Sequence, residues 1–255
     1  MATDFRPALL IVDLQNDFCP PVRPTPLLYS PLHTYEFLSV FADLDQQNGS
    51  LAVTNGREII PVVNKLLSLP FILKIATKDW HPQDHISFAS NHAGKRPFVD
   101  TTTIFNPCNR AESYESRLWP DHCIQDTPGA ALVSELQVEK LDRVVEKGQR
   151  REVEMYSAFY DPLQSPRCSD SGLAEALMEE GITDVYVVGL AFDYCVKATA
   201  VDARKEGYAT VVVGDGTRAV DAGNWEKVCG ELEGLGIGVV GVEGEEVKRV
   251  GREEF

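Results

Sequence analysis

Six short apolar runs alternate along the chain with longer segments in which apolar residues recur at helical spacing. The runs are rich in Val, Ile and Leu and lack strict apolar–polar alternation, which is typical of parallel strands buried on both faces. They cover residues 8–12, 71–76, 143–145, 185–190, 209–213 and 237–242. The pattern predicts the strands of one central sheet.

Four segments between these runs are expected to form helices. Residues 55–69 place aliphatic side chains on one face, with Asn55 as the N-cap and Pro61 in or near the first turn. Residues 171–180, 193–206 and 224–235 each run up to a glycine, which is a common signal for the end of a helix. The alternation predicts an α/β fold of three α/β/α layers with a mainly parallel, six-stranded sheet.

Two stretches interrupt the alternation. Residues 21–48 contain four prolines, and residues 83–130 carry few helix or strand signals. Loops of this length are uncommon in compact domains unless they form a site or are disordered. We expect a surface loop insertion at 22–48 and a site-building segment at 83–130. Because no repeat or low-complexity linker occurs, residues 1–255 are predicted to be a single domain.

Composition and charge narrow the classes of function. The 255 residues are 44% hydrophobic and 25% charged, which excludes a mostly disordered chain. The net charge of −15 argues against nucleic acid and anionic membranes as partners. Without an apolar run of membrane length or a signal-peptide layout, we expect an intracellular, cytoplasmic protein that acts on a small molecule; a nuclear location and a homo-oligomer stay open. An acidic stretch at residues 243–254 is expected to be a solvated face or a frayed terminus.

The six cysteines are scattered and form no CxxC pair. In an intracellular chain this argues against a disulfide framework and against a Cys-rich zinc module. At most one or two of these cysteines are therefore expected to take part in chemistry.

Reactive side chains stand where the predicted strands end. The first strand runs into Asp13, the second into Asp79 and His81, the third into Lys147, and the fourth is followed by Cys195. In open α/β sheets the ligand crevice lies beyond the carboxyl ends of the strands. These five side chains are therefore expected to converge.

Cys195, Lys147 and Asp13 together suit nucleophilic catalysis. Cys195 falls in the first turn of a predicted helix, where the helix dipole and a nearby Lys147 would lower the pKa of the thiol. Asp13 would raise this pKa, yet could accept the proton as a general base. Taken alone, Cys195 is more typical of a small buried residue, Asp13 of an N-cap and Lys147 of a solvated loop charge.

The Asp-x-His sequence at Asp79 and His81 indicates a metal site. It puts two ligands on one side of the chain, and a third could come from His85, His92 or His122. One carboxylate and two imidazoles suit zinc, iron or manganese with open positions for water or substrate. By spacing alone, a hydrogen-bonded structural pair of histidines is the more common outcome.

The segments that carry these residues resemble the nicotinamidases, a family of isochorismatase-like cysteine hydrolases, and most closely the fungal ones. The similarity covers most of the chain. Its motifs are Leu-Ile-Val-Asp-Leu-Gln-Asn-Asp-Phe at 10–18, Asp-Trp-His-Pro at 79–82, Leu-Trp-Pro-Asp-His-Cys at 118–123, Val-Glu-Lys-Gly at 145–148, Tyr-Ser-Ala-Phe at 156–159 and Val-Gly-Leu-Ala-Phe-Asp-Tyr-Cys-Val-Lys-Ala-Thr-Ala at 188–200. The visible departure is the insertion at 22–48, which delays the Gly-Ser-Leu-Ala-Val stretch at 49–53 and costs no catalytic position.

The resemblance implies a role for each matching residue. The catalytic triad would be Asp13, Lys147 and Cys195, and the oxyanion hole would be the backbone N–H groups of Ala191 and Cys195, next to a cis peptide bond at 190–191. The ligands of one divalent metal ion, most commonly Zn²⁺, would be Asp79, His81 and His122, with His85 at or near the metal. The aromatic residues around the substrate ring would be Phe18, Trp119, Tyr156 and Tyr194.

The activity that the resemblance implies is metal-dependent hydrolysis of the carboxamide of nicotinamide to nicotinate and ammonia through a thioester. Pyrazinamide-like analogues are expected to be accepted, because they also present a ring nitrogen and a carboxamide. Two alternatives stay open: an amidase for carbamoyl or ureido substrates without a metal, and a binding protein that keeps the fold without catalysis.

Overall fold

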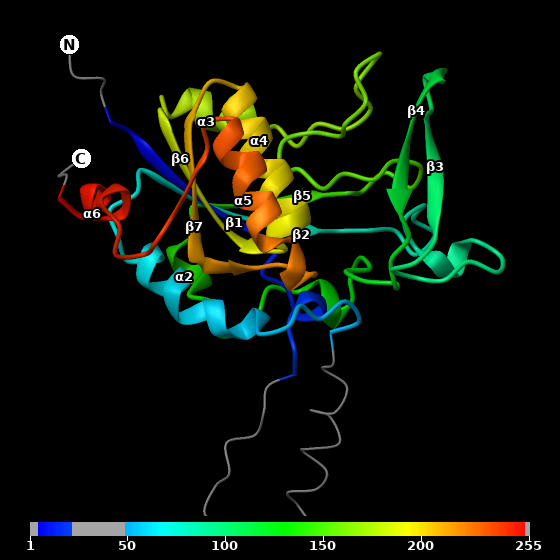
Figure 1. Cartoon of the computed structure of the whole chain (residues 1–255), viewed down its shortest axis with the longest axis horizontal. Helices are drawn as coiled ribbons and strands as arrows, with labels where there is room; N and C mark the ends of the chain where they lie inside the picture. The colour runs from blue at the N-terminus through cyan, green and yellow to red at the C-terminus, as the bar shows by residue number, and fades with distance from the viewer. Residues whose placement is uncertain (1–4, 22–48, 253–255) are drawn as a thin grey trace, which may run out of the picture.

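The fold is that of a computed structural model, which describes residues 5–21 and 49–252 (Figure 1). The expected insertion at 22–48 lies outside the described residues. None of the helices in the described part of the chain is both long and apolar enough to cross a membrane.

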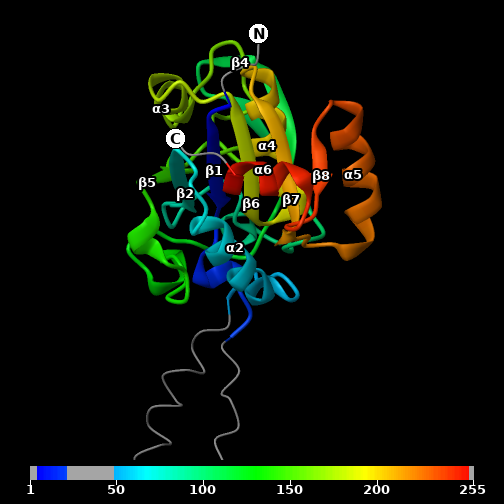
Figure 2. The same cartoon turned by 90° about the vertical axis from the view of Figure 1, so that its left-hand side faces the viewer.

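Six parallel strands form the central sheet, as the apolar runs predict. They follow one another across Figure 2 in the order β5, β2, β1, β6, β7, β8. Their bounds are Arg143–Lys147, Leu73–Asp79, Pro7–Val12, Asp184–Leu190, Ala209–Arg218 and Gly238–Val240. The central strand β1 is buried along its whole length, and its Leu10 pairs with Ile75 of β2 and Val187 of β6. Burial on both faces explains why this strand is uniformly apolar.

Helices cover both faces of the sheet, which gives the expected three layers (Figure 1). Helices α3 (Leu173–Glu179), α4 (Lys197–Lys205) and α5 (Trp225–Gly234) pack into one apolar cluster with Leu10. Helices α2 (Ile60–Leu67) and α6 (Glu245–Arg252) pack into the other with Leu9 and Ile11. Neighbouring residues of β1 therefore face opposite layers, as the period of a strand requires.

The predicted helix at 55–69 is divided in the structure. A 3₁₀ turn, η2 (Gly56–Ile59), precedes α2, and Pro61 lies in the first turn of α2 as predicted. The prediction of Asn55 as a side-chain cap is wrong: its side chain makes no capping hydrogen bond, and its backbone is left-handed at φ 58°. Capping side chains normally project from extended backbone.

A two-stranded hairpin and a helix were not predicted from the sequence. The hairpin of β3 (Thr101–Asn106) and β4 (Asn109–Arg117) lies within residues 83–130 and stands apart from the central sheet (Figure 1). Near the end of the chain, the acidic stretch forms α6, whose Val247 and Val250 are buried. The alternative of a solvated acidic face therefore holds at Glu245, whereas Glu253 and Glu254 lie outside the described residues.

Candidate active site

Four neighbouring strands end at one edge of the sheet, and each supplies a side chain to the same cluster. Lys147 ends β5, Asp79 ends β2, Asp13 follows β1, and Cys195 follows β6. Because these strands are adjacent in the order β5, β2, β1, β6, residues far apart in sequence become neighbours. The structure thus brings together four of the five side chains that were expected to converge, and the fifth, His81, adjoins them through Asp79.

Lys147 lies at the centre of this cluster and is almost completely buried. Its ammonium nitrogen is 2.6 Å from Asp79 Oδ1, 3.0 Å from Asp13 Oδ2 and 3.6 Å from Cys195 Sγ. Burial acts to lower the pKa of Lys147, but Asp13 and Asp79 outweigh it and raise this pKa well above its usual value. Lys147 is therefore a permanent cation between two carboxylates and the thiol.

Asp13 is held in a fixed orientation beside this cation. Its Oδ1 accepts a hydrogen bond of 2.6 Å from the Thr77 hydroxyl, whereas Oδ2 lies 3.0 Å from the Lys147 ammonium nitrogen. One carboxylate oxygen of Asp13 also lies within 4.8 Å of Cys195 Sγ and of a carboxylate oxygen of Asp79. Burial, followed by repulsion from Asp79, raises the pKa of Asp13 to about 6. A carboxylate with this pKa is ionised at neutral pH and is a stronger base than an exposed one.

The structure corrects the expected lowering of the Cys195 pKa. Cys195 lies in a short π-helix, η6 (Phe192–Val196), that precedes α4. Burial raises the pKa of the thiol well above its usual value, Lys147 opposes this, and Asp13 reinforces it. In the resting protein the thiol therefore keeps its proton. The peptide bond between Leu190 and Ala191 is cis, as the resemblance implied.

A second cluster adjoins the first through Asp79. Ligand atoms of Asp79, His81 and His122 all lie within 4.8 Å of one another, and all three residues are buried. His81 Nδ1 donates a hydrogen bond to the Gly148 carbonyl oxygen at 2.8 Å, and His122 Nδ1 donates one to the Pro120 carbonyl oxygen at 2.7 Å. Because carbonyl oxygens only accept, both rings must carry their proton on Nδ1, which leaves Nε2 as a ligand.

The electrostatics of this second cluster favour a cation. His81 Nε2 is buried without a hydrogen-bond partner among the described residues. Burial acts to lower the pKa of His81, but Asp79 outweighs it and raises this pKa, which shows that positive charge is stabilised there. Burial, and then the charge on His81, lower the pKa of His122 to about 4, so that its ring is neutral. The three residues therefore fit a divalent metal.

His85 lies beside the second cluster, which is formed by Asp79, His81 and His122, but it offers no ligand atom to that cluster. Its ring stacks on His81 with centroids 4.1 Å apart. His85 Nε2 donates to the Val153 carbonyl oxygen at 3.1 Å, and Nδ1 lies 2.8 Å from Ser87 Oγ. Burial lowers the pKa of His85 well below its usual value. Since both ring nitrogens are engaged, His85 is a neutral neighbour that packs against His81.

Four aromatic residues predicted to surround the substrate belong to one apolar cluster. Phe18 packs on His122 with ring centroids 5.4 Å apart. Trp119 and Tyr194 meet edge to face at 4.8 Å, and the Trp119 indole N–H donates to the Tyr156 hydroxyl at 2.9 Å. The predicted aromatic residues are therefore in one apolar cluster, which contacts the second cluster through His122.

Several supporting residues were not identified from the sequence. Gln15 accepts from the Asp79 N–H and donates to the Asp79 carbonyl, both at 2.8 Å. Asp17 accepts from the Cys123 N–H at 2.7 Å and so holds the segment that carries His122. Both lie within the motif at 10–18, which was a signal for them. Glu154, buried near His81, had no such signal.

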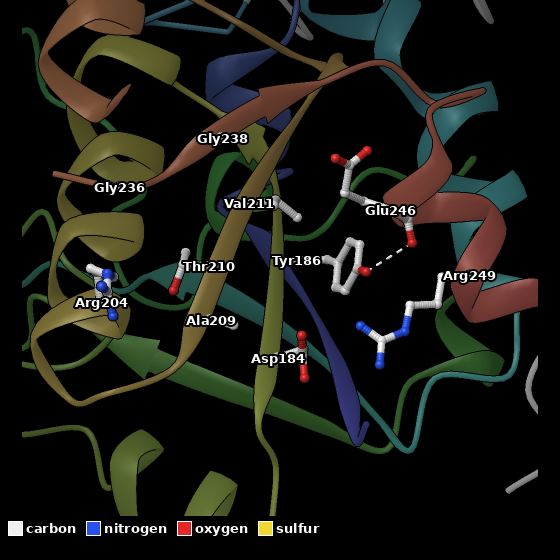
Figure 3. Close-up of a pocket in the computed structure, with 10 residues that line it drawn as sticks. All are labelled: Asp184, Tyr186, Arg204, Ala209, Thr210, Val211, Gly236, Gly238, Glu246 and Arg249. Atoms are coloured by element: carbon white, nitrogen blue, oxygen red, sulfur yellow. Dashed lines mark hydrogen bonds between the residues drawn. The ribbon is translucent and has the colours of Figure 1, made fainter. Parts of the chain in front are cut away.

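A hollow away from the two clusters contains none of the predicted site residues. It has a volume of ≈ 360 Å³ and lies at the amino ends of β6 and β7, opposite the catalytic edge (Figure 3). Its wall is closed on one side by α6, where the Tyr186 hydroxyl donates to the Glu246 carbonyl oxygen at 2.8 Å. The predicted nucleophile, base and metal ligands therefore lie in the two clusters around Lys147 and His81, and not in this hollow.

Comparison with known proteins agrees with this fold and site. The isochorismatase domain family matches residues 7–243. A nicotinamidase of Acinetobacter baylyi is 37% identical over 214 residues, which cover 84% of this chain and 82% of that protein. The structure of the yeast nicotinamidase Pnc1p bound to the inhibitor nicotinaldehyde has a TM-score of 0.75 at 34% identity and covers 92% of this chain and 99% of that one. The pyrazinamidase of Pyrococcus horikoshii in complex with zinc has a TM-score of 0.63 at 30% identity, with coverage of 92% and 99%.

The fold and the comparisons define a hydrolase of the α/β class that acts on a carboxamide. The chain belongs to the isochorismatase family and, within it, to the nicotinamidases. Membership supports hydrolysis of nicotinamide to nicotinate as its activity.

Proposed function

We propose that the chain hydrolyses nicotinamide through a thioester on Cys195, with Asp13 as the base and Lys147 as the fixed cation. The observation that carries this proposal is the position of Lys147 Nζ, 3.0 Å from Asp13 Oδ2 and 3.6 Å from Cys195 Sγ. A nucleophile, a base and a positive charge are thereby joined at one point, which is the arrangement that covalent catalysis needs.

The first half of the reaction forms the thioester. Asp13 removes the thiol proton as Cys195 Sγ attacks the carboxamide carbon, since the thiol keeps its proton at rest. The backbone N–H groups of Ala191 and Cys195 stabilise the developing oxyanion, and such donors contribute about 3 kcal/mol each in comparable sites. Asp13 then returns the proton to the amide nitrogen, the C–N bond breaks, and ammonia leaves.

The second half releases the acid. Water attacks the thioester carbon and gives its proton to Asp13. The C–S bond breaks, nicotinic acid forms, and Asp13 returns the proton to Cys195. The acid then loses its own proton to solvent and leaves as nicotinate. Lys147 stabilises the thiolate each time that it appears and holds the Asp13 carboxylate beside it.

Substrate binding uses the aromatic residues and the second cluster. Phe18, Trp119, Tyr156 and Tyr194 enclose the pyridine ring and orient it for attack. Asp79, His81 and His122 hold one divalent metal ion, for which we favour zinc because a zinc-bound pyrazinamidase has a similar fold. When bound, this ion supplies a Lewis acid for the ring nitrogen. Pyrazinamide shares the ring nitrogen and the carboxamide, so we expect it to be a second substrate.

A substrate panel tests this proposal. Purified, metal-loaded protein is incubated with nicotinamide, pyrazinamide, benzamide and a carbamoyl amide, and released ammonia is measured. We expect rapid release from the first two compounds and weak release from benzamide, which lacks the ring nitrogen. Preferred release from the carbamoyl amide by folded protein would refute the assignment of the substrate.

A further inference from the structure

Two cysteines outside the active site are brought together around one asparagine. Cys108 lies in the turn between β3 and β4, and Cys168 lies in the loop that precedes α3. Asn106 Oδ1 accepts a hydrogen bond of 2.9 Å from the Cys108 backbone N–H and one of 3.3 Å from the Cys168 thiol. Asn106 Oδ1 therefore contacts both the Cys108 backbone and the Cys168 thiol, which places the two cysteines side by side.

The backbone on each side of this thiol pair is fixed by further hydrogen bonds. The Asn106 side-chain amide donates to the Pro166 carbonyl oxygen at 2.9 Å and to Glu112 Oε2 at 2.7 Å. Glu112 in turn accepts from the Gln164 N–H at 2.7 Å. The hairpin and the loop are therefore joined at several points around the two cysteines.

The two thiols differ in exposure in a way that suits sequential oxidation. Cys108 is exposed, whereas Cys168 is only partly so. Burial, and then the charge on Asp161, raise the pKa of Cys168, which makes its thiolate scarce and leaves the exposed Cys108 as the thiol that meets peroxide first. Cys19, Cys123 and Cys195 are buried, and Cys229 lies on α5.

We propose that Cys108 and Cys168 are a site of reversible oxidation, at which hydrogen peroxide joins the hairpin to the loop before α3 through a disulfide. Cys108 attacks peroxide, the O–O bond breaks, and a sulfenic acid and one water form. Cys168 then attacks the sulfenic sulfur, the S–S bond forms, and a second water leaves. Two thiols are oxidised and one peroxide is reduced to two waters.

The disulfide would affect the residues of β4 that hold the aromatic side chains in place, and it would not touch the reacting groups. On β4, the Tyr114 hydroxyl donates to the Glu154 carbonyl at 2.8 Å and accepts from the Glu154 N–H at 3.1 Å. Two residues further along β4, Ser116 Oγ lies 3.4 Å from the Tyr156 hydroxyl. A hairpin tethered by the disulfide would thus fix the position of β4, whose Ser116 contacts Tyr156.

Peptide mapping after oxidation tests the proposal. The intact protein is treated with a small excess of hydrogen peroxide, alkylated, and digested with trypsin and a glutamate-specific protease without reduction. Trypsin alone leaves Cys168 and Cys195 in one peptide, whereas cleavage after Glu175 separates them. We expect peptides 96–110 and 168–175 to appear joined, with a mass two hydrogens below their sum, and to separate after dithiothreitol treatment.

Three variants make the result specific. Cys108→Ser and Cys168→Ser should each abolish the joined peptide, and Cys229→Ser, the matched control on α5, should retain it. Because Cys108 is exposed, its serine variant is expected to fold. The proposal is overturned if the wild-type protein yields singly oxidised Cys108 without the joined peptide, or if Cys108 is joined to a cysteine other than Cys168.

Discussion

Thr77 holds Asp13 by two hydrogen bonds that run in opposite directions. The Asp13 backbone N–H donates to Thr77 Oγ1 at 3.1 Å, and the Thr77 hydroxyl donates to Asp13 Oδ1 at 2.6 Å. Both residues are completely buried: Thr77 lies on β2, and Asp13 directly follows the adjacent strand β1. One carboxylate oxygen is thereby occupied by the hydroxyl, which leaves the other to face Lys147 and to accept the Cys195 proton.

Replacing the Thr77 hydroxyl should weaken catalysis and shift its pH dependence. The hydroxyl lowers the pKa of Asp13, so Thr77→Val raises this pKa and moves the acid limb of the kcat/KM profile to higher pH. A hydrogen bond to a charged group contributes about 1.5–3 kcal/mol, which corresponds to a loss of roughly 10- to 100-fold in turnover. Thr210→Val is the matched control, because Thr210 is also buried in the sheet but bonds only to the Tyr208 carbonyl. An unchanged pH profile in Thr77→Val would contradict this role.

The wild-type pH profile should have an acid limb near the pKa of Asp13. Burial and then Asp79 raise this pKa to about 6, and only the ionised carboxylate can accept the thiol proton. Activity is therefore expected to be retained above pH 6 and to fall by about tenfold per pH unit well below it. Steady-state kcat/KM values for nicotinamide measured across this range check the prediction. A profile that stays flat to pH 4 would exclude Asp13 as the base.

Removing the cation between the two carboxylates should destabilise the fold as well as stop turnover. Lys147→Met leaves Asp13 and Asp79 buried without their shared partner. Breaking a buried ion pair in this way costs about 3–5 kcal/mol. Urea unfolding followed by circular dichroism measures the loss, and Lys65→Met, which removes an exposed ion pair with Glu243, should leave the midpoint unchanged. Equal midpoints for Lys147→Met and the wild type would refute the account of this cluster.

Metal content should depend on His122 and not on His92. His122→Ala removes one of three clustered ligands, and the bound metal measured by elemental analysis after dialysis should fall by tenfold or more. The matched variant His92→Ala removes a histidine whose Nε2 donates to the Ile86 carbonyl oxygen at 2.7 Å, away from the cluster. Full metal occupancy in His122→Ala would show that the ligand set is wrong.

The sheet was predictable because its strands are buried on both faces. In β1 and β6 the sequence is almost uniformly apolar, and nothing except a buried strand or helix produces such runs. The hairpin of β3 and β4 gave no comparable signal, because side chains such as Thr101, Thr103 and Glu115 are exposed and few apolar positions alternate. A short polar helix such as α6, with only Val247 and Val250 buried, escapes detection for the same reason.

The reactive residues could be located from the sequence, but their electrostatics could not. Strand ends and motifs placed Asp13, Lys147 and Cys195 in one site. The expected lowering of the Cys195 pKa rested on the helix dipole and on Lys147, whereas the thiol is buried and burial outweighs Lys147. The contact between Thr77 and Asp13 joins residues 64 positions apart in sequence, so no local pattern could reveal it.

Ammonia release from nicotinamide by matched cysteine variants tests the central claim most directly. Wild-type protein and Cys229→Ala should release ammonia at similar rates, because Cys229 lies on α5 away from the cluster. Cys195→Ala should release none while it keeps the wild-type circular dichroism spectrum and metal content. Ammonia release from Cys195→Ala at a rate near that of the wild type would contradict the assignment of Cys195 as the nucleophile.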